Sequence, residues 1–318
     1  MKKNKKTFFI VEILLLILAL VCVWKIFNQN VPEKRVAVIL PEVGDNRWDS
    51  MIKGMKQSAE KNHIHLIICN TDEVESAEVE KEIIKEQQNN HIDAFLVWPA
   101  SGKETEEMLK AECANIPVIL LVENVYSDNN LKSDTFSKIG PDFYEMGALL
   151  AEKISSTGGS IGIVAGKKES EASASAVQGF IETLEQTGGQ VKWCYYQTED
   201  TDVFDEINAN PSVDHLVVLD SGMLDKIGDA VEGDGYNGSK VWGIGFSVKA
   251  IAMLDYGNIE GLVVPDGYEI GYKSVEAMAK RLQNSFDKDE NTEITVKMLQ
   301  KEDLFLDEDT ERFLYSYE

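Results

Sequence analysis

The sequence of 318 residues is poor in positive charge and in cysteine. Lys and Arg number 31 against 55 Asp and Glu, a formal net charge of −24. Because nucleic acid binding needs clustered Lys and Arg, we expect no nucleic acid partner. Outside the apolar N-terminal run the cysteines are Cys69, Cys113 and Cys194, an odd number that cannot all pair within one chain. A disulfide framework is therefore not indicated.

Motifs that carry catalysis are also missing. Gly158, Gly159 and Gly162 precede a predicted strand, whereas a phosphate-binding loop needs its glycines after a strand and at the start of a helix. The segment Gly243–Ser247 lacks the third glycine, the Walker lysine and the serine of a nucleophile elbow. The four histidines form no zinc ligand set. We therefore predict that the chain is not an enzyme and uses no catalytic residue, metal or cofactor.

The N-terminus carries a basic flank followed by a long apolar run. Four lysines lie within residues 2–6, and residues 8–27 are apolar apart from Glu12 and Lys25. A run of about 20 apolar residues is long enough to cross a bilayer, and no small-residue cleavage site precedes Gln29. We predict a cytoplasmic flank at 1–7, a transmembrane signal anchor at 8–27 and a spacer at 28–34.

This anchor predicts a single-pass protein of the cell membrane whose remaining residues are extracytoplasmic. Cys22 leaves open an alternative, a lipid-modified cysteine at the end of the apolar stretch. Val21 is a poor residue to precede a lipidated cysteine, so the interpretation as a lipid-facing apolar residue is preferred.

The body of the chain alternates short apolar runs with segments of helical period. Strands are predicted at 35–40, 65–70, 94–98 and 118–122, and helices between them at 75–88 and 103–114. Trp48, Ile52, Met55 and Ala59 share one face of a further helix. The charged run from Glu75 to Glu86 is interpreted as a solvated helix face. This order is typical of a parallel sheet covered by helices on both faces.

A second set of units begins at Pro141. Asp142 and Glu145 have the spacing of a capping box at the start of a helix over 142–155. Further strands are predicted at 160–164, 191–196, 215–219, 241–244, 261–264 and 293–298. The fold class is therefore α/β, with two similar doubly wound parallel-sheet lobes joined by a multi-strand hinge. We assign 35–140 plus 266–292 to lobe 1 and 141–265 plus 293–318 to lobe 2.

Several short sequence segments, taken in order along the chain, carry a family resemblance. They are Arg35–Leu40, Asp45–Trp48, Gly54, Asn115–Ile119, Ile139–Asp142 with Gly147, Gln178–Phe180, Gly243–Phe246 and Met298–Asp303. In these segments the chain from about Arg35 to Leu304 resembles the type I periplasmic binding proteins for ribose and galactose, which are related to the ligand domain of lactose-repressor-type regulators. The resemblance implies two lobes that close around a small ligand at their hinge.

The resemblance also implies a set of ligand-binding residues. In that family aromatic rings pack on the apolar face of the sugar and polar groups bind its hydroxyls. The matching positions here are Asp45, Arg47, Trp48, Trp98, Glu123, Asp220, Phe246 and Ser247. Trp48 as a core residue and Asp45 as a helix cap remain alternatives.

Departures from the family pattern affect the expected ligand. Val122–Glu123 stands where sugar binders often carry Asp-Arg, Ser173–Ser175 where another arginine is expected, and Pro265 near an expected glutamine. Arginine forks and amides give directional recognition of hydroxyls. Without them, an acidic lining of Asp45, Glu123 and Asp220 is expected, which suits a sugar-like or amine-bearing ligand.

Two functions follow from the resemblance and the anchor. The first is extracytoplasmic capture of a sugar or sugar-like small molecule for an ABC-type permease. The second is a sensory or scaffolding ectodomain that signals to a membrane histidine kinase, with a degenerate pocket in the extreme case. A repressor is excluded because an apolar N-terminal run stands in place of a DNA-binding headpiece.

Overall fold

The chain divides into two units, residues 1–34 and 35–318. The computed structural model describes residues 8, 11–21, 34–42, 46–71, 74–127, 135–198, 201–231, 235–283 and 291–304. In the first unit residues 11–21 are helical. Among the described residues, no helix has both the length and the hydropathy needed to span a membrane. The predicted span over 8–27 is described only at residue 8 and at 11–21, and its remaining residues lie outside the described part.

Lobe 1 is built on a six-stranded sheet whose strand order is β11-β5-β4-β3-β1-β2. Its strands are β1 (Lys34–Ile39), β2 (Ile64–Ile68), β3 (Ala94–Val97), β4 (Val118–Leu121), β5 (Ser137–Gly140) and β11 (Thr292–Glu293). The strands from β11 to β1 pair in parallel. Alternate residues of β1 face opposite cores, because Val36 and Val38 pack in one apolar cluster and Ala37 and Ile39 in another.

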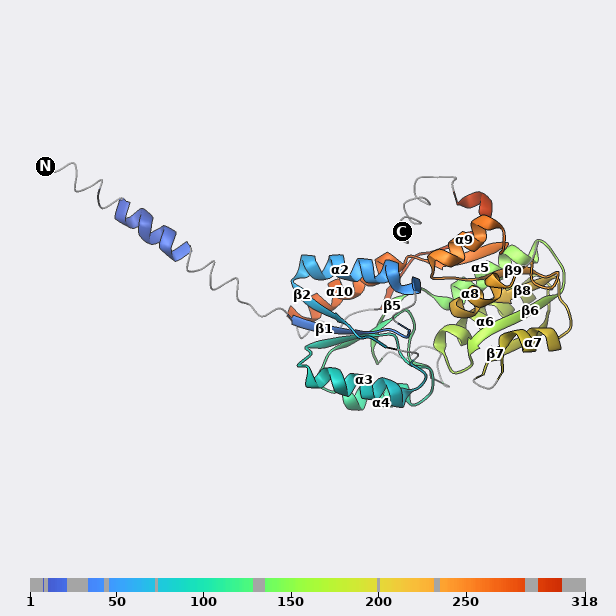
Figure 1. Cartoon of the computed structure of the whole chain (residues 1–318), viewed down its shortest axis with the longest axis horizontal. Coiled ribbons are helices and arrows are strands. Elements are labelled where there is room, and N and C mark those ends of the chain that lie inside the picture. The colour runs from blue at the N-terminus through green and yellow to red at the C-terminus, as the bar shows by residue number, and fades with distance from the viewer. Residues whose placement is uncertain are drawn as a thin grey trace. The chain divides into compact units, whose positions relative to one another are not determined.

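Helices cover both faces of this sheet (Figure 1). Helices α2 (Asp49–Asn62) and α10 (Gly267–Gln283) lie on one face, and α3 (Ala77–Asn89) and α4 (Thr105–Glu112) lie on the other. The predicted apolar face of the first helix is confirmed, since Trp48, Met55 and Ala59 are buried and Ile52 packs against the same cluster.

The charged helix α3 departs from its interpretation as a solvated face. Lys81 and Lys85 do make exposed ion pairs with Glu78 and Glu82. Glu80, however, is fully buried, and its Oε2 accepts a hydrogen bond of 2.7 Å from the backbone N–H of Ala100. The interpretation is therefore wrong at this one position, where the carboxyl group holds the loop that follows β3.

Lobe 2 repeats the arrangement with strand order β12-β10-β9-β8-β6-β7. Its strands are β6 (Ile161–Lys167), β7 (Val191–Gln197), β8 (His215–Val218), β9 (Lys240–Ile244), β10 (Gly261–Pro265) and β12 (Val296–Leu299). Only β12 is antiparallel to its described neighbour. Helices α5 (Phe143–Ser155) and α6 (Glu171–Gln186) cover one face, and α8 (Ser221–Asp229) and α9 (Val248–Tyr256) cover the other, near α7 (Val203–Ala209).

Helix pairs approach so closely that only glycine fits at their crossings. A Cβ on Gly271 of α10 would lie 1.9 Å from the backbone oxygen of Met51 on α2. In lobe 2 a Cβ on Gly147 of α5 would lie 2.0 Å from the oxygen of Ala176 on α6. The same device therefore holds one helix pair in each lobe.

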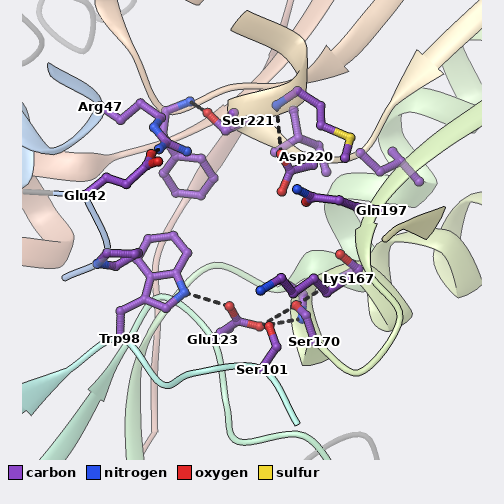
Figure 2. Close-up of a pocket in the computed structure, with 18 of the residues that line it drawn as sticks. Glu42, Arg47, Trp98, Ser101, Glu123, Lys167, Ser170, Gln197, Asp220 and Ser221 are labelled. Atoms are coloured by element: carbon purple, nitrogen blue, oxygen red, sulfur yellow. Dashed lines mark hydrogen bonds and ion pairs between the residues drawn. The ribbon is translucent and has the colours of Figure 1, made fainter. Parts of the chain in front are cut away.

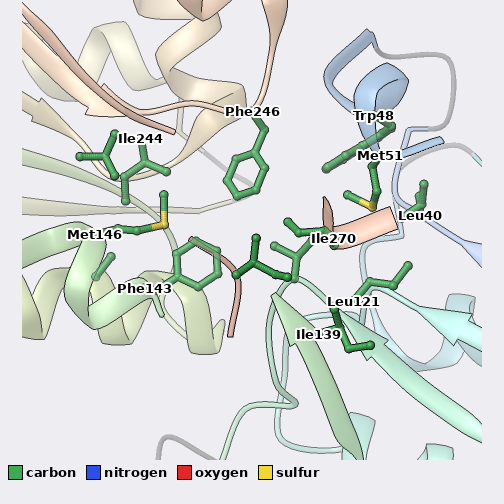
Figure 3. Close-up of a cluster of buried hydrophobic side chains, with 14 of the residues drawn as sticks. Leu40, Trp48, Met51, Leu121, Ile139, Phe143, Met146, Ile244, Phe246 and Ile270 are labelled. Carbon is green, nitrogen blue, oxygen red and sulfur yellow. The ribbon is translucent and has the colours of Figure 1, made fainter. Parts of the chain in front are cut away.

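The chain crosses between the lobes after β5, after β10 and between β11 and β12. The single strand predicted over 293–298 is two strands, one for each sheet, because the chain turns at Ile294 from pairing with β5 to pairing with β10. Strand β10 belongs to the second sheet, while α10 packs on α2 in the first lobe. An apolar cluster that includes Phe143, Phe246 and Ile270 joins the two lobes at these crossings (Figure 3).

Candidate functional site

A cavity of about 650 Å³ lies between the two lobes (Figure 2). Residues at or just after the carboxyl ends of β1, β3, β4, β6, β7, β8 and β9 line it. The polar lining includes Glu42, Arg47, Ser101, Glu123, Lys167, Ser170, Gln197, Asp220, Ser221, Asp225, Lys226 and Lys249. This is where parallel α/β sheets bind ligands, because strand ends and helix N-termini meet there.

Aromatic rings from both lobes form one wall of the cavity. The ring centroids of Trp48 and Trp98 are 4.7 Å apart in an edge-to-face arrangement, and those of Trp98 and Phe246 are 6.0 Å apart. Phe143 lies 6.3 Å beyond Phe246. Trp48 is 2% exposed and its indole N–H donates to the oxygen of Pro41. Trp48 is thus a core residue and also part of the cavity wall. Its two interpretations, as a core residue and as a ligand contact, are therefore compatible.

Arg47 lies beside this wall. Its Nη2 is 2.5 Å from Oε2 of Glu42, and its guanidinium lies 5.2 Å from the centre of the Trp48 ring. These contacts fix a cation at the rim of the aromatic surface. Asp45, also predicted to bind ligand, lies outside the described residues.

Glu123 projects from the end of β4 into the space between the lobes (Figure 2). Its Oε1 accepts a 2.7 Å hydrogen bond from the indole N–H of Trp98. Its Oε2 accepts from the hydroxyl of Ser170 at 2.7 Å and from the backbone N–H of Ala172 at 3.0 Å. Burial raises the pKa of Glu123 from 4.5 to about 7, although all three hydrogen bonds act in the opposite direction.

A tight turn before Glu123 sets its direction. Val122 has φ of 67°, a left-handed conformation that is rare for a β-branched residue, and the N–H of Glu123 bonds back to the oxygen of Leu121. A Cβ on Gly140 would lie 2.2 Å from the oxygen of Val122, so the neighbouring strand needs glycine there. The turn redirects the chain at the end of the strand and brings the carboxyl group of Glu123 to lobe 2.

The predicted residues of lobe 2 have different roles. Asp220 lines the cavity and also caps α8, since its Oδ1 accepts from the N–H of Met223. Phe246 lines the cavity as an aromatic contact. Ser247 is buried and does not line it, because its hydroxyl caps α9 and donates to Oδ1 of Asp225. The structure therefore brings Arg47, Trp48, Trp98, Glu123, Asp220 and Phe246 to one cavity and places Ser247 behind it.

The charge of the lining differs from the acidic wall predicted above. Among the described lining residues Glu42, Glu123, Asp220 and Asp225 are balanced by Arg47, Lys167, Lys226 and Lys249. Asp220 and Glu123 already accept hydrogen bonds from the protein, and Glu42 pairs with Arg47. The lining thus carries both signs of charge, and the prediction of an acidic wall is wrong for this part of the chain.

Two polar residues were missed at the ends of lobe 2 strands. Lys167 ends β6 and Gln197 ends β7, and both face the cavity opposite the aromatic wall (Figure 2). The rule that ligands bind at strand carboxyl ends already points to Gln197, directly after the predicted strand over 191–196. Lys167 lies three residues beyond the predicted strand end at 164, so the rule does not reach it.

Comparisons with known proteins agree with this architecture. Residues 36–285 match a family model described as "Periplasmic binding protein domain". Catabolite control protein A of Staphylococcus aureus is 26% identical over 158 residues, or 49% of this chain and 45% of that protein. The alignment thus spans less than half the length of this curated relative.

Solved structures share the fold over almost the whole body. A carbohydrate transporter solute binding protein from Agrobacterium radiobacter, solved in complex with D-arabinose, has a TM-score of 0.76 at 17% identity, covering 90% of this chain and 100% of that chain. A chain of the XylFII–LytSN complex has a TM-score of 0.70 at 14% identity, covering 85% and 99%.

Proposed function

Since this chain belongs to the periplasmic binding protein domain family, we propose that it binds a sugar or sugar-like small molecule between its lobes for an ABC-type permease. The family is non-enzymatic, in agreement with the prediction that the chain is not an enzyme. The observation that carries the proposal is the aromatic wall of Trp48, Trp98 and Phe246 on one side of a cavity that has polar side chains on the other.

This combination suits the two kinds of surface on a sugar. The C–H face of a pyranose or furanose ring packs on aromatic rings, while its hydroxyls need donors and acceptors. Lys167, Gln197 and Ser221 supply donors and acceptors to this cavity, in the absence of the family's usual arginines. A cavity of about 650 Å³ is within the range for small-molecule sites. The structurally similar Agrobacterium protein holding D-arabinose supports a monosaccharide.

An amine-bearing ligand has less support than a neutral sugar. That idea depended on an acidic lining, whereas Glu42 pairs with Arg47 and Glu123 is held by three hydrogen bonds. Asp220 is a helix cap. A neutral polyhydroxy ligand makes no demand for a free charge and is the better match.

A thermal-shift screen of the full chain in detergent against monosaccharides and polyols tests the proposal. A binder at 100 times its Kd should stabilise the folded state by about 2.7 kcal/mol and raise Tm.

Trp98→Ala is expected to weaken binding of the best ligand at least tenfold, because it removes an aromatic contact in the cavity. Tyr256→Ala, an aromatic that is 79% exposed and outside the cavity, is the matched control. Absence of any hit, or unchanged affinity in Trp98→Ala, would contradict the proposal.

We also propose that residues 8–27 anchor the protein in the cell membrane with its body on the extracytoplasmic side. Support comes from the length of the apolar run and from the lysines that precede it. The full chain should sediment with membranes and resist extraction by high salt, whereas a chain without residues 8–27 should not be membrane-bound. Release of the full chain by high salt alone would count against the anchor.

Sensing is the second candidate, with a membrane histidine kinase as the partner. It is favoured by the short predicted spacer, which keeps the body beside the membrane, and by the similarity to a chain solved in a complex with another protein. Neighbouring genes distinguish the two functions. Permease and ATPase genes favour transport, and a kinase and regulator pair favours sensing.

A further inference from the structure

Two buried glutamates, one in each lobe, accept hydrogen bonds from the opposite lobe. Glu123 of lobe 1 accepts hydrogen bonds from Ser170 and Ala172 of lobe 2, at 2.7 and 3.0 Å. Glu171 of lobe 2 accepts a bond of 3.1 Å from the backbone N–H of Asn124 in lobe 1. The two carboxylates are thus reciprocal, and each binds a backbone N–H of the opposite lobe.

Both oxygens of each carboxylate accept a hydrogen bond from the protein. Glu123 is 6% exposed, and its second oxygen accepts from the indole N–H of Trp98. Glu171 is 1% exposed, and its second oxygen accepts from the hydroxyl of Ser175. Glu123 thus holds the two lobes together from the wall of the cavity, a role that its position in the sequence did not indicate.

The lobe 2 partners of Glu123 lie at the start of a helix. Ser170 caps α6, and Ala172 is in its first turn, where backbone N–H groups lack partners within the helix. A carboxylate is favoured at this end by the helix dipole. The helix N-terminus thus receives from the other lobe a group that a bound anion would otherwise supply.

We propose that Glu123 and Glu171 are positioning residues that hold the two lobes closed in the absence of a ligand. Through the bond to Trp98, the closed arrangement also fixes the aromatic wall relative to lobe 2. This device goes beyond sugar binding and does not depend on it. A backbone hydrogen bond of 2.8 Å, from the N–H of Gly102 to the oxygen of Glu169, also joins the lobes.

Closure is expected to take up a proton. Glu123 keeps its pKa near 7 only while it is buried between the lobes, and exposure in an open form returns the pKa toward 4.5. The closed form therefore binds the proton more tightly, so closure is favoured at low pH and weakens as pH rises through 7. The charged groups near Glu123 are Glu171 from α6, which raises its pKa further, and Lys167 from β6 and the Glu42–Arg47 pair around the cavity.

Distances between spin labels on the ligand-free full chain in detergent test this proposal. Keto amino acids at Glu107 and Asp205, one exposed position in each lobe, carry the labels without involving native cysteines. The wild type should shift toward longer distances between pH 6 and pH 8.5. The closing equilibrium should change by about tenfold over this interval, as a pKa of 7 against 4.5 for one proton requires.

Glu123→Ala and Glu171→Ala each remove the oxygen that accepts a backbone N–H from the opposite lobe, and both should be open at both pH values. Glu60→Ala, the same change at an exposed position of lobe 1 outside the cavity, should behave as the wild type. Glu123→Gln resembles the protonated carboxyl group and keeps an oxygen for the N–H of Ala172, so its distances should not change with pH. If Glu123→Ala fails to fold, the wild-type pH series and Glu171→Ala decide. Equal distances in the wild type at both pH values, or Glu171→Ala distances equal to those of the wild type, would overturn the proposal, and no arm requires a sugar.

Discussion

Gly179→Val is expected to unfold lobe 2 at a much lower temperature than the wild type. A Cβ on Gly179 of α6 would lie 2.0 Å from the backbone oxygen of Tyr144 on α5, and Gly147 makes the reverse contact with α6. A backbone oxygen cannot rotate away as a side chain can, so the helices must separate. Overpacking of this kind costs about 3 kcal/mol or more, which lowers Tm by about 10 °C. Thermal unfolding followed by circular dichroism measures the change.

Glu185→Val is the matched control, since it places the same β-branched side chain on an exposed position of the same helix. It should lower the stability by only the helix propensity of valine, about 0.5 kcal/mol. A Gly179→Val protein that melts within a degree of this control would show that the helices can separate at little cost.

Glu80→Gln is expected to stabilise the protein at pH 8 and to leave it nearly unchanged at pH 5. Burial raises the pKa of Glu80 from 4.5 to about 8, and its Oε1 has no hydrogen-bond partner among the described residues. Between these two pKa values the folded chain holds a proton that the unfolded chain releases. The free energy of unfolding therefore falls as pH rises from 5 to 8, by up to about 1.4 kcal/mol per pH unit.

Glutamine keeps an oxygen for the N–H of Ala100 and carries no charge to desolvate, so this part of the slope should disappear. At pH 8 the variant should be more stable than the wild type by about 2 kcal/mol or more, measured by urea unfolding at several pH values. Glu107→Gln, an exposed change on α4, should leave the slope as it is. A slope in Glu80→Gln equal to that of the wild type would mean that Glu80 is already hydrated.

The two parallel sheets could be predicted because fully buried parallel strands appear in the sequence as apolar runs. All four residues of β3 and of β4 are buried, and the sequence shows both as unbroken apolar runs. Asp142 also caps its helix as predicted, with Oδ1 accepting from the N–H groups of Tyr144 and Glu145. Strand β5 was missed because half of its four residues, Ser137 and Lys138, are polar and give no apolar run. That lysine is buried, and its Nζ reaches the oxygen of Pro141.

The location of the site could be predicted, but not the role of each side chain. Trp98 and Phe246 follow strands, and strand ends in both lobes face the same cleft. Glu123 follows a strand too, yet its partners lie 47 and 49 residues further along the chain, in the other lobe. Local sequence carries no signal for such a pairing. Ser247 has the same difficulty, because a serine after a strand serves equally as a helix cap or a ligand contact.

The short strand β11 has a consequence for how the protein is made. It completes the lobe 1 sheet beside β5, and α10 covers α2, yet both elements follow the whole of lobe 2 in the chain. As the chain leaves the ribosome, β5 remains an unpaired sheet edge and α2 remains uncovered until lobe 2 has been synthesised. Lobe 2 has nearly all of its sheet by then and lacks only β12. The lobe that begins first is thus completed late, and a chaperone acting during synthesis is expected to bind the unfinished edge of lobe 1.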